Sequence, residues 1–184
     1  MPLEGSKVVL RQKRLSDARN DFMWSTDEEL SRLDASRPLS LTFCEAQVLY
    51  EDELTFPQSR KQRFAIETRS GLHIGNCMVY DINKFKGEAE LGIMIGDRRF
   101  WGKAYGTGAV RLLLEHIFSE TKLNRVYLHT LDWNIRAQKS FEKVGFVAKG
   151  NVRKNGHNFL TMEISRERWQ QLTPEVGREM VQAS

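Results

Sequence analysis

A glycine-punctuated segment in the middle of the chain has the residue types and spacing of an anion-binding loop. Gly106 and Gly108 come just before a run in which apolar residues recur at helical intervals, from Val110 to Phe118. Glycine lets the backbone approach a ligand closely, and a helix start offers unpaired N–H groups and the positive end of its dipole to an anion. Residues 98–109 therefore predict a loop that binds a diphosphate.

The spacing of this loop excludes two common diphosphate motifs. A Walker loop requires G-x-x-x-x-G-K-[ST], and the dinucleotide fingerprint requires G-x-G-x-x-G with an acidic residue about 20 positions later. Residues 103–108 read K-A-Y-G-T-G and instead fit [QR]-x-x-G-x-[GA], with lysine in the first position. The loop is preceded at 88–95 by a strand-like alternation of apolar residues with polar or small ones. A second strand-like run, 125–131, leads into N-I-R-A-Q-K-S-F-E-K-V-G-F at 134–146.

Taken together, these segments resemble the GNAT superfamily of N-acetyltransferases. Residues 134–146 match its signature N-x-x-A-x-x-x-[YF]-E-K-x-G-F, and the resemblance is strongest to the branch with the RimJ/RimL protein N-terminal acetyltransferases. The specific match runs from Glu88 to Phe146, and a looser one covers most of the chain. The resemblance implies an α+β fold with a mostly antiparallel central sheet, helices on both faces and one splayed parallel strand pair. Gly92 is expected to mark a bulge where the splay starts.

The resemblance also implies acetyl-CoA as co-substrate and suggests which residues hold it. Main-chain groups of residues 93–95 contact pantetheine while the Ile93 and Ile95 side chains stay free to fill the core, and an N–H there polarises the thioester carbonyl. Asn134 caps the following helix and bonds the cofactor chain. Lys103 is favoured as a phosphate contact. For Arg98 and Arg99, a phosphate contact and a solvated position in the loop are equally expected. The predicted cofactor-binding residues are Ile93, Met94, Ile95, Arg98, Lys103, Ala104, Tyr105, Gly106, Thr107, Gly108 and Asn134.

Transfer of an acetyl group to an amine needs a base, a stabilised oxyanion and a route for the thiolate to leave. Glu90 is the predicted base, acting directly or through a water, with Glu88 as the substitute and a surface glutamate as the alternative. Phe141 stands where many relatives carry a catalytic tyrosine, so a phenolic acid is excluded there. Ser140 is the predicted proton donor to the thiolate, against the alternatives of a solvated serine and of water completing the step.

Several other residues leave two interpretations open. His129 lines the acceptor pocket or packs, and packing is favoured. Trp101 is expected to buttress the loop. The acidic residues 27–29 either attract a cationic acceptor or complement the dipole of a helix start. Cys44 and Cys77 lack metal-ligand spacing and are expected to be core thiols, which predicts no metal site.

The remaining sequence predicts a strand before the first helix and an antiparallel meander before the loop. Apolar periodicity, capping boxes and turn residues set the boundaries. The predicted elements are a strand at 7–11, helical turns from Ser16 with a capping box at 26–29, a helix from Thr42 to Pro57, strands at 62–68 and 73–82, a hairpin turn at Asn155-Gly156, and a helix at 167–172.

Length and composition agree with one domain over residues 1–184, since 184 residues with 40% apolar content can bury one sizeable core. The N-terminus lacks an apolar signal region and no run approaches the roughly 18 apolar residues of a membrane span, so a cytoplasmic protein without membrane contact is expected. The 28 basic and 24 acidic residues are interspersed, which makes nucleic acid binding a minor alternative.

The sequence therefore predicts an acetyl-CoA-dependent N-acetyltransferase in which a primary amine attacks directly within a ternary complex. A protein N-terminal α-amine is one expected acceptor, and a small-molecule amine such as a polyamine, amino acid or aminoglycoside is the other. A non-catalytic CoA-binding sensor is the alternative from another class, motivated by Phe141. The acceptor-selecting segments, 16–60 and 149–159, carry no further signal, and a homodimer is left open as the state of assembly.

Overall fold

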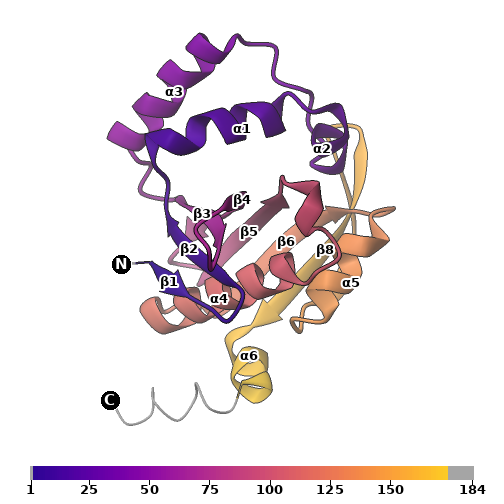
Figure 1. The fold of residues 1–184 in the computed structure, drawn as a ribbon. Helices are drawn as coiled ribbons and strands as arrows, with labels where there is room; N and C mark the ends of the chain where they lie inside the picture. Colours follow the sequence, from indigo (N-terminus) through magenta and orange to yellow (C-terminus); the bar gives the residue numbers. More distant parts are fainter. Residues whose placement is uncertain (1, 174–184) are drawn as a thin grey trace.

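The computed structural model describes residues 2–173, and a central sheet organises them. Its strands follow the spatial order β1-β2-β3-β4-β5-β6-β8-β7, and every neighbouring pair is antiparallel except β5 and β6 (Figure 1). This confirms the predicted α+β sheet with one parallel pair. The strands are β1 (Leu3–Glu4), β2 (Val8–Gln12), β3 (Gln62–Thr68), β4 (His73–Asn83), β5 (Glu88–Ile95), β6 (Arg125–Leu131), β7 (Val147–Lys154) and β8 (His157–Ser165).

Helices cover both faces of the sheet (Figure 1). The apolar stripe predicted between Val110 and Phe118 faces the core, where Leu113 and Leu114 have no exposed surface. On the other face, α1, α2 and α3 form an arc above the strands. The helices are α1 (Ala18–Ser25), α2 (Glu28–Leu33), α3 (Phe43–Thr55), α4 (Tyr105–Glu120), α5 (Ile135–Glu142) and α6 (Arg166–Leu172), with single 3-10 turns at Leu15–Asp17 and Arg98–Phe100.

The parallel strands β5 and β6 separate after only three paired positions. Glu90 opposite Tyr127 is the last pair, yet β5 continues to Ile95 and β6 to Leu131. Each strand instead stays with its antiparallel neighbour, because β5 pairs with β4 up to Ile95 and β6 pairs with β8 along its whole length. The opening therefore lies between two antiparallel strand pairs, β4–β5 and β6–β8.

The bulge predicted at Gly92 is wrong. Gly92 lies in regular register opposite Met78, and the only register shift between β4 and β5 falls between Tyr80 and Asn83. A bulge at Gly92 would interrupt the β4–β5 ladder, whereas the separation occurs on the opposite edge of β5. Beyond Glu90 the backbone on that edge has no partner strand among the described residues and can receive a ligand, apart from the Ile95 carbonyl, which accepts the Trp101 indole N–H.

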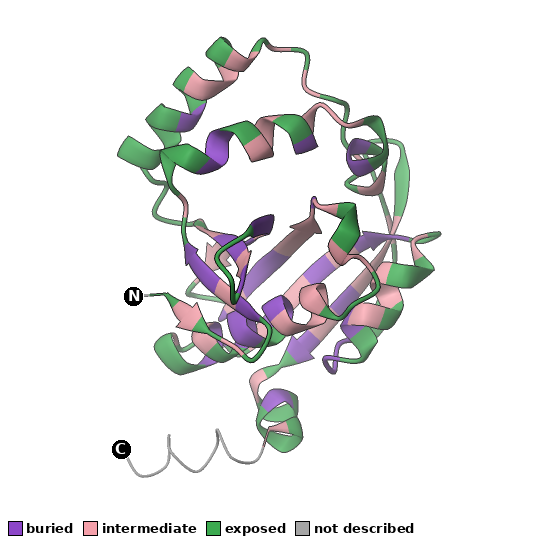
Figure 2. Cartoon of the chain, viewed as in Figure 1, coloured by how far each residue is buried: buried purple, intermediate pink, exposed green. Residues whose placement is uncertain are grey.

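Two further expectations about the N-terminal third need correction. Asp27, rather than Thr26, caps α2 by accepting a hydrogen bond from the Leu30 amide, and the Thr26 hydroxyl bonds back to the carbonyl of Phe22. Cys44 is exposed and only Cys77 is buried. The reason is that α3 presents most of its surface to solvent (Figure 2), although its predicted Thr42–Glu45 capping box is confirmed.

Candidate active site

The start of α4 has the features of an anion-binding site. Ala104 adopts a left-handed conformation (φ +65°) just before the helix, a strained choice for a residue other than glycine. The Gly108 amide donates to the Ala104 carbonyl, so the amides of Tyr105, Gly106 and Thr107 precede the first helical hydrogen bond and lack an acceptor within α4. These three N–H groups can bind a phosphate.

Packing within the protein does not require glycine at this helix start. A Cβ atom added to Gly106 would meet only the Ile95 Cγ1 atom at 3.6 Å, and one added to Gly108 would meet only the Val8 Cγ2 atom at 3.8 Å. Both are ordinary van der Waals distances. Gly106 lines the neighbouring cleft. The close approach of a ligand therefore explains better than internal packing why this position has no side chain.

A cleft of about 620 Å³ lies between the end of β5, the start of α4 and α5. Trp101 forms part of its wall, and the Trp101 indole N–H donates to the Ile95 carbonyl at 2.6 Å, which confirms its predicted role as a support of the loop. Asn134 also lines the cleft while its side chain caps α5 by accepting from the Ala137 amide. The predicted residues that line the cleft are Ile93, Met94, Ile95, Ala104, Tyr105, Gly106, Thr107 and Asn134.

A second cavity, of about 640 Å³, lies on the other side of the opening, beneath α1 and α3. Ile93, Met94 and Phe141 line both spaces, so cleft and cavity meet where β5 and β6 separate. Glu90 lines the cavity at that point and is only 8% exposed. Glu88 does not line it, because its carboxylate binds the Arg125 guanidinium at 2.5 Å.

His129 does more than pack, in contrast to the favoured prediction. Its ring lines the cavity, and Nδ1 lies 2.7 Å from the Glu90 Oε1 atom. The Nε2 atom lies 3.1 Å from the Lys154 ammonium. The arrangement arises because β6 carries His129 just past the last residue that pairs with β5, Tyr127, where the side chain can reach across the opening.

The sequence of the chain matches one family over most of its length. Residues 7–147 match the model of the acetyltransferase (GNAT) domain. The chain belongs to this family. The assignment confirms the expectation of a GNAT acetyltransferase, the class that uses acetyl-CoA as acetyl donor, and it agrees with a cleft that ends at a helix start with three amides that lack an acceptor within the helix.

Known relatives of this GNAT domain include polyamine acetyltransferases. It is 28% identical over 85 residues to the spermine/spermidine N(1)-acetyltransferase of Bacillus subtilis, covering 46% of this chain and 56% of that protein. The chain thus spans about half the length of that relative. It is 27% identical over 147 residues to the spermidine N(1)-acetyltransferase of Vibrio cholerae, covering 80% of this chain and 83% of that protein. The RimJ/RimL branch is not specifically identified by these relatives.

A solved structure shares the fold. The spermidine N-acetyltransferase of Vibrio cholerae, determined in complex with CoA and spermine, superposes with a TM-score of 0.79 at 22% sequence identity. The alignment covers 90% of this chain and 99% of the other. At this identity the likeness establishes the common architecture of the two proteins.

The cations that line the GNAT cleft are not the ones expected from the sequence. Four basic side chains line it, from α4, from α5 and from the residue that follows α5. Three of them lie at positions 136, 139 and 143, one face of a helix, so helical periodicity within the signature would have indicated them. A cationic wall suits a diphosphate. The residues are Arg111, Arg136, Lys139 and Lys143.

The two loop cations proposed as phosphate contacts differ in their surroundings. The Arg98 guanidinium binds the carboxylates of Asp27 (2.7 Å) and Glu29 (2.9 Å), which holds the pKa of Asp27 below its usual value. Among residues 2–173, Lys103 has no carboxylate within ion-pair distance. Neither side chain lines the cleft, so both phosphate contacts stay predictions.

Ser140 lies on the cofactor side of the junction. Its hydroxyl is 2.9 Å from that of Thr107, which joins α5 to the first turn of α4, and both residues line the cleft. Phe141, 8% exposed, lies beside it at the junction of cleft and cavity and offers no hydroxyl. The role of Ser140 as proton donor to the thiolate stays a prediction.

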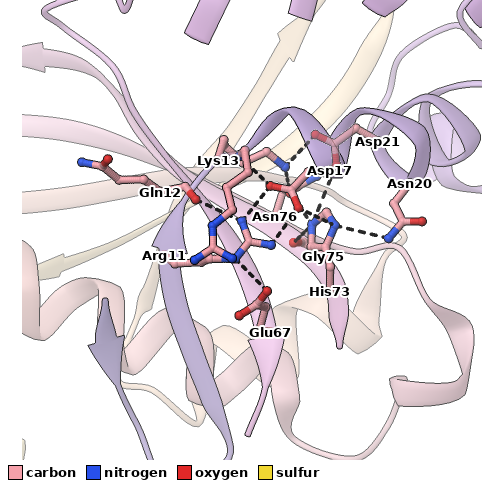
Figure 3. A network of polar contacts seen from close by, with 11 residues as sticks. Arg11, Gln12, Lys13, Asp17, Asn20, Asp21, Glu67, His73, Gly75 and Asn76 are labelled. Carbon is pink, nitrogen blue, oxygen red and sulfur yellow. Dashed lines mark hydrogen bonds and ion pairs between the residues drawn. The ribbon is translucent and has the colours of Figure 1, made fainter. Parts of the chain in front are cut away.

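A buried polar network borders the second cavity beneath α1 and α3 (Figure 3). Arg11 binds Asp17 through two nitrogens at 2.7 Å, and Lys13 binds Asp21 at 2.6 Å. Burial lowers the pKa of Lys13 despite this ion pair. Burial and the Lys13 charge likewise lower the pKa of His73, so its ring stays neutral near pH 7.

Between residues 2 and 173, no three His, Cys, Asp or Glu side chains are grouped so that they could hold a metal ion. Over the same residues, no helix has both the length and the apolar character needed to cross a membrane.

Proposed function

We propose that this GNAT protein transfers the acetyl group of acetyl-CoA directly to a primary amine while both substrates are bound. The opening between β5 and β6 is the observation that supports the proposal. Direct attack requires the two substrates to meet in one place, and Ile93 and Met94 line both the cofactor cleft and the acceptor cavity. An acceptor in the cavity can therefore reach a group held in the cleft without leaving the protein.

The residues of the cleft fit acetyl-CoA. The free amides at the start of α4 and the cationic wall suit the pyrophosphate, and Gly106 leaves room for its approach. The unpaired edge of β5 offers main-chain N–H and C=O groups to the pantetheine arm. Acetyl-CoA supplies an activated acetyl thioester, and an N–H of residues 93–95 is proposed to stabilise charge on its carbonyl oxygen.

A small-molecule amine is the proposed acceptor class. The two relatives that are polyamine acetyltransferases support it, and the cavity has the size of a small-molecule site. A protein N-terminal α-amine is the second candidate, supported by the resemblance of residues 88–146 to the RimJ/RimL-like branch. The α-amine has an unperturbed pKa of about 7.7–8.0 against about 10.4 for a lysine-type amine, so it needs less help to lose its proton.

The experiment that tests the proposal measures free-CoA release from acetyl-CoA across polyamines, amino acids, aminoglycosides and N-terminal peptides. Binding of acetyl-CoA to the same sample is measured by calorimetry. Amine-dependent CoA release would support the transferase and identify its acceptor class. Tight binding of acetyl-CoA without release for any amine would favour the CoA-binding sensor, and absence of binding would contradict the proposal.

A further inference from the structure

We propose that the Nε2 atom of His129 takes the proton from the acceptor amine, and that Glu90 acts through His129 by fixing its tautomer. The inference rests on the proposed acetyl transfer and assigns its base. It modifies the simpler prediction, in which the Glu90 carboxylate itself receives the proton. His129 would then be a catalytic residue and Glu90 a positioning residue.

The hydrogen bond between the two side chains determines where the imidazole can accept a proton. The side chains of Glu90 and His129 are 10% and 13% exposed, respectively, and the distance from Nδ1 of His129 to Oε1 of Glu90 is 2.7 Å. A carboxylate only accepts hydrogen bonds, so a neutral His129 must carry its proton on Nδ1 to make this contact. The lone pair then lies on Nε2. The Oε1 atom of Glu90 is engaged by His129, whereas the acceptor site of the imidazole, Nε2, takes no part in this contact.

An amine of the protein itself shows that the Nε2 atom is accessible from the cavity. The Lys154 side chain reaches His129 from the end of β7, lines the same cavity and brings its Nζ atom to 3.1 Å from Nε2. An alkylammonium group thus lies beside the imidazole, 3.1 Å from Nε2 and 3.5 Å from Nδ1. Lys154 is exposed and directly precedes the Asn155-Gly156 turn, so an acceptor amine can replace it at this position.

Few other groups act on the imidazole. The rings of Tyr127 and Phe159 pack edge-on against it with centroid separations of 5.7 and 6.3 Å. The charged groups that face it are Glu90 from β5 and Lys154 from β7. Burial and the Glu90 carboxylate raise the pKa of the nearby Tyr80 phenol on β4, which therefore stays protonated at neutral pH. The imidazole thus lies between one negative and one positive charge.

The proposed step balances as follows. The acceptor ammonium gives one proton to Nε2 of His129, and the freed nitrogen lone pair forms the bond to the acetyl carbon. The carbon–sulfur bond breaks and its electron pair leaves with CoA as a thiolate. The nitrogen loses its second proton, which ends on the thiolate, and His129 returns its own proton to solvent. The products are the N-acetylated amine, free CoA and one proton.

The test compares His129→Gln with His157→Gln, which changes an exposed histidine on the adjacent strand outside both cavities. Glutamine keeps a side-chain amide for Glu90 but is not a base. We expect His129→Gln to lower kcat/KM for the amine about 100-fold, within the range typical of general bases, and to remove the acidic limb of its pH profile. Acetyl-CoA affinity should stay within about twofold of wild type for both variants, and His157→Gln should keep the wild-type rate.

A second pair of variants tests the assignment through charge. Glu90→Gln removes the negative neighbour and should move the midpoint of the acidic limb to lower pH, while Lys154→Met removes the positive neighbour and should move it to higher pH. Opposite shifts are not expected from a merely structural contact. This pair also decides the question if His129→Gln does not fold.

The failures of the two proposals can be distinguished. If the wild-type protein releases CoA with an amine but His129→Gln keeps both its rate and its pH profile, the assignment of His129 is wrong and the transferase stands. Equal profiles for Glu90→Gln, Lys154→Met and wild type would overturn the assignment in the same way. If the wild-type protein transfers acetyl to no amine, the proposed function itself fails.

Discussion

Two polar clusters in this protein contain the same residue types and differ in what their hydrogen bonds leave free. One lies below α1 and combines Asp17 and Asp21 with His73 and Lys13 (Figure 3). The other lies at the opening between β5 and β6 and combines Glu90, His129 and Lys154. Each is a carboxylate, imidazole and ammonium in contact.

In the cluster below α1, both ring nitrogens of the imidazole have partners. The Nε2 atom of His73 lies 2.9 Å from the Gly75 carbonyl, the Nδ1 atom lies 3.4 Å from the Asn20 amide nitrogen, and Lys13 is 4% exposed. At the opening, by contrast, Nε2 of His129 meets only an exposed lysine. The comparison teaches that the types of residue do not decide between structure and chemistry. What decides is whether the imidazole keeps an acceptor whose partner is an exposed side chain that a substrate can displace.

The largest expected effect is a loss of stability when the polar cluster below α1 is disrupted. Asp17→Ala should lower the free energy of unfolding by about 3–5 kcal/mol, because it leaves the buried Arg11 guanidinium without its bidentate partner. Denaturant unfolding measures the change. Arg69→Met, which breaks the exposed pair with Glu4, is the matched control and should cost about 0–1 kcal/mol. Equal effects of the two substitutions would contradict the contrast drawn between buried and exposed pairs.

How far the sequence predicts this molecule follows from how its parts are assembled. The cofactor side is built largely from 88–146, where strand, loop and helices follow one another, so the motifs and the family resemblance they carry predicted eight of the residues that line the cleft. The acceptor side is not local in this sense. Lys154 comes near His129 only because β8 pairs with both β6 and β7, and no local pattern contains that register.

The misplaced features have similar causes. The expected bulge at Gly92 was based on the flexibility of glycine, whereas the strands part because each keeps its antiparallel neighbour. Cys44 lies on a helix whose apolar residues looked sufficient for a buried face, yet Leu49 on the same helix is 55% exposed. The burial of α3 depends on what packs above it, which its own sequence does not determine.

The second prediction applies the same principle to the unsatisfied amides of α4. Gly106→Val should weaken acetyl-CoA binding about 10- to 100-fold, or about 1.4–2.7 kcal/mol, because a side chain would block the approach to these amides. Gly106→Ala should weaken binding less and stabilise the fold by up to about 1 kcal/mol, because its Cβ meets only Ile95 at 3.6 Å. Calorimetric binding and thermal unfolding measure the two quantities. Unchanged affinity in both variants would contradict the anion-binding loop.

A third, smaller effect concerns pH and stability. Burial and the charge of Lys13 lower the pKa of His73 in the folded protein. Below about pH 6.5, His73 therefore binds a proton in the unfolded chain more readily than in the folded protein. The contribution of neutral His73 is thus present above that pH and is lost as pH falls, by up to about 1.4 kcal/mol per pH unit. Unfolding free energies at pH 7.5 and 5.5 should differ less in His73→Gln than in wild type or in the control His157→Gln. If His73→Gln shows the same difference as wild type, His73 is not the source of the pH dependence.

The smallest effects are expected for Lys103 and Arg98, two cations of one loop that differ in whether a carboxylate pairs with them. Lys103→Met should raise KM for acetyl-CoA about two- to fivefold, a change of about 0.4–1 kcal/mol, since its ammonium has no carboxylate partner among the described residues. Arg98→Met should raise KM less, because Asp27 and Glu29 already neutralise that guanidinium. Adding 0.5 M salt should reduce the difference between Lys103→Met and wild type, as expected for an exposed charge acting on a phosphate. A larger effect of Arg98→Met than of Lys103→Met would show that Arg98 leaves its carboxylates when the cofactor binds. An ion pair in the free protein would then not exclude a role of that charge in binding the cofactor.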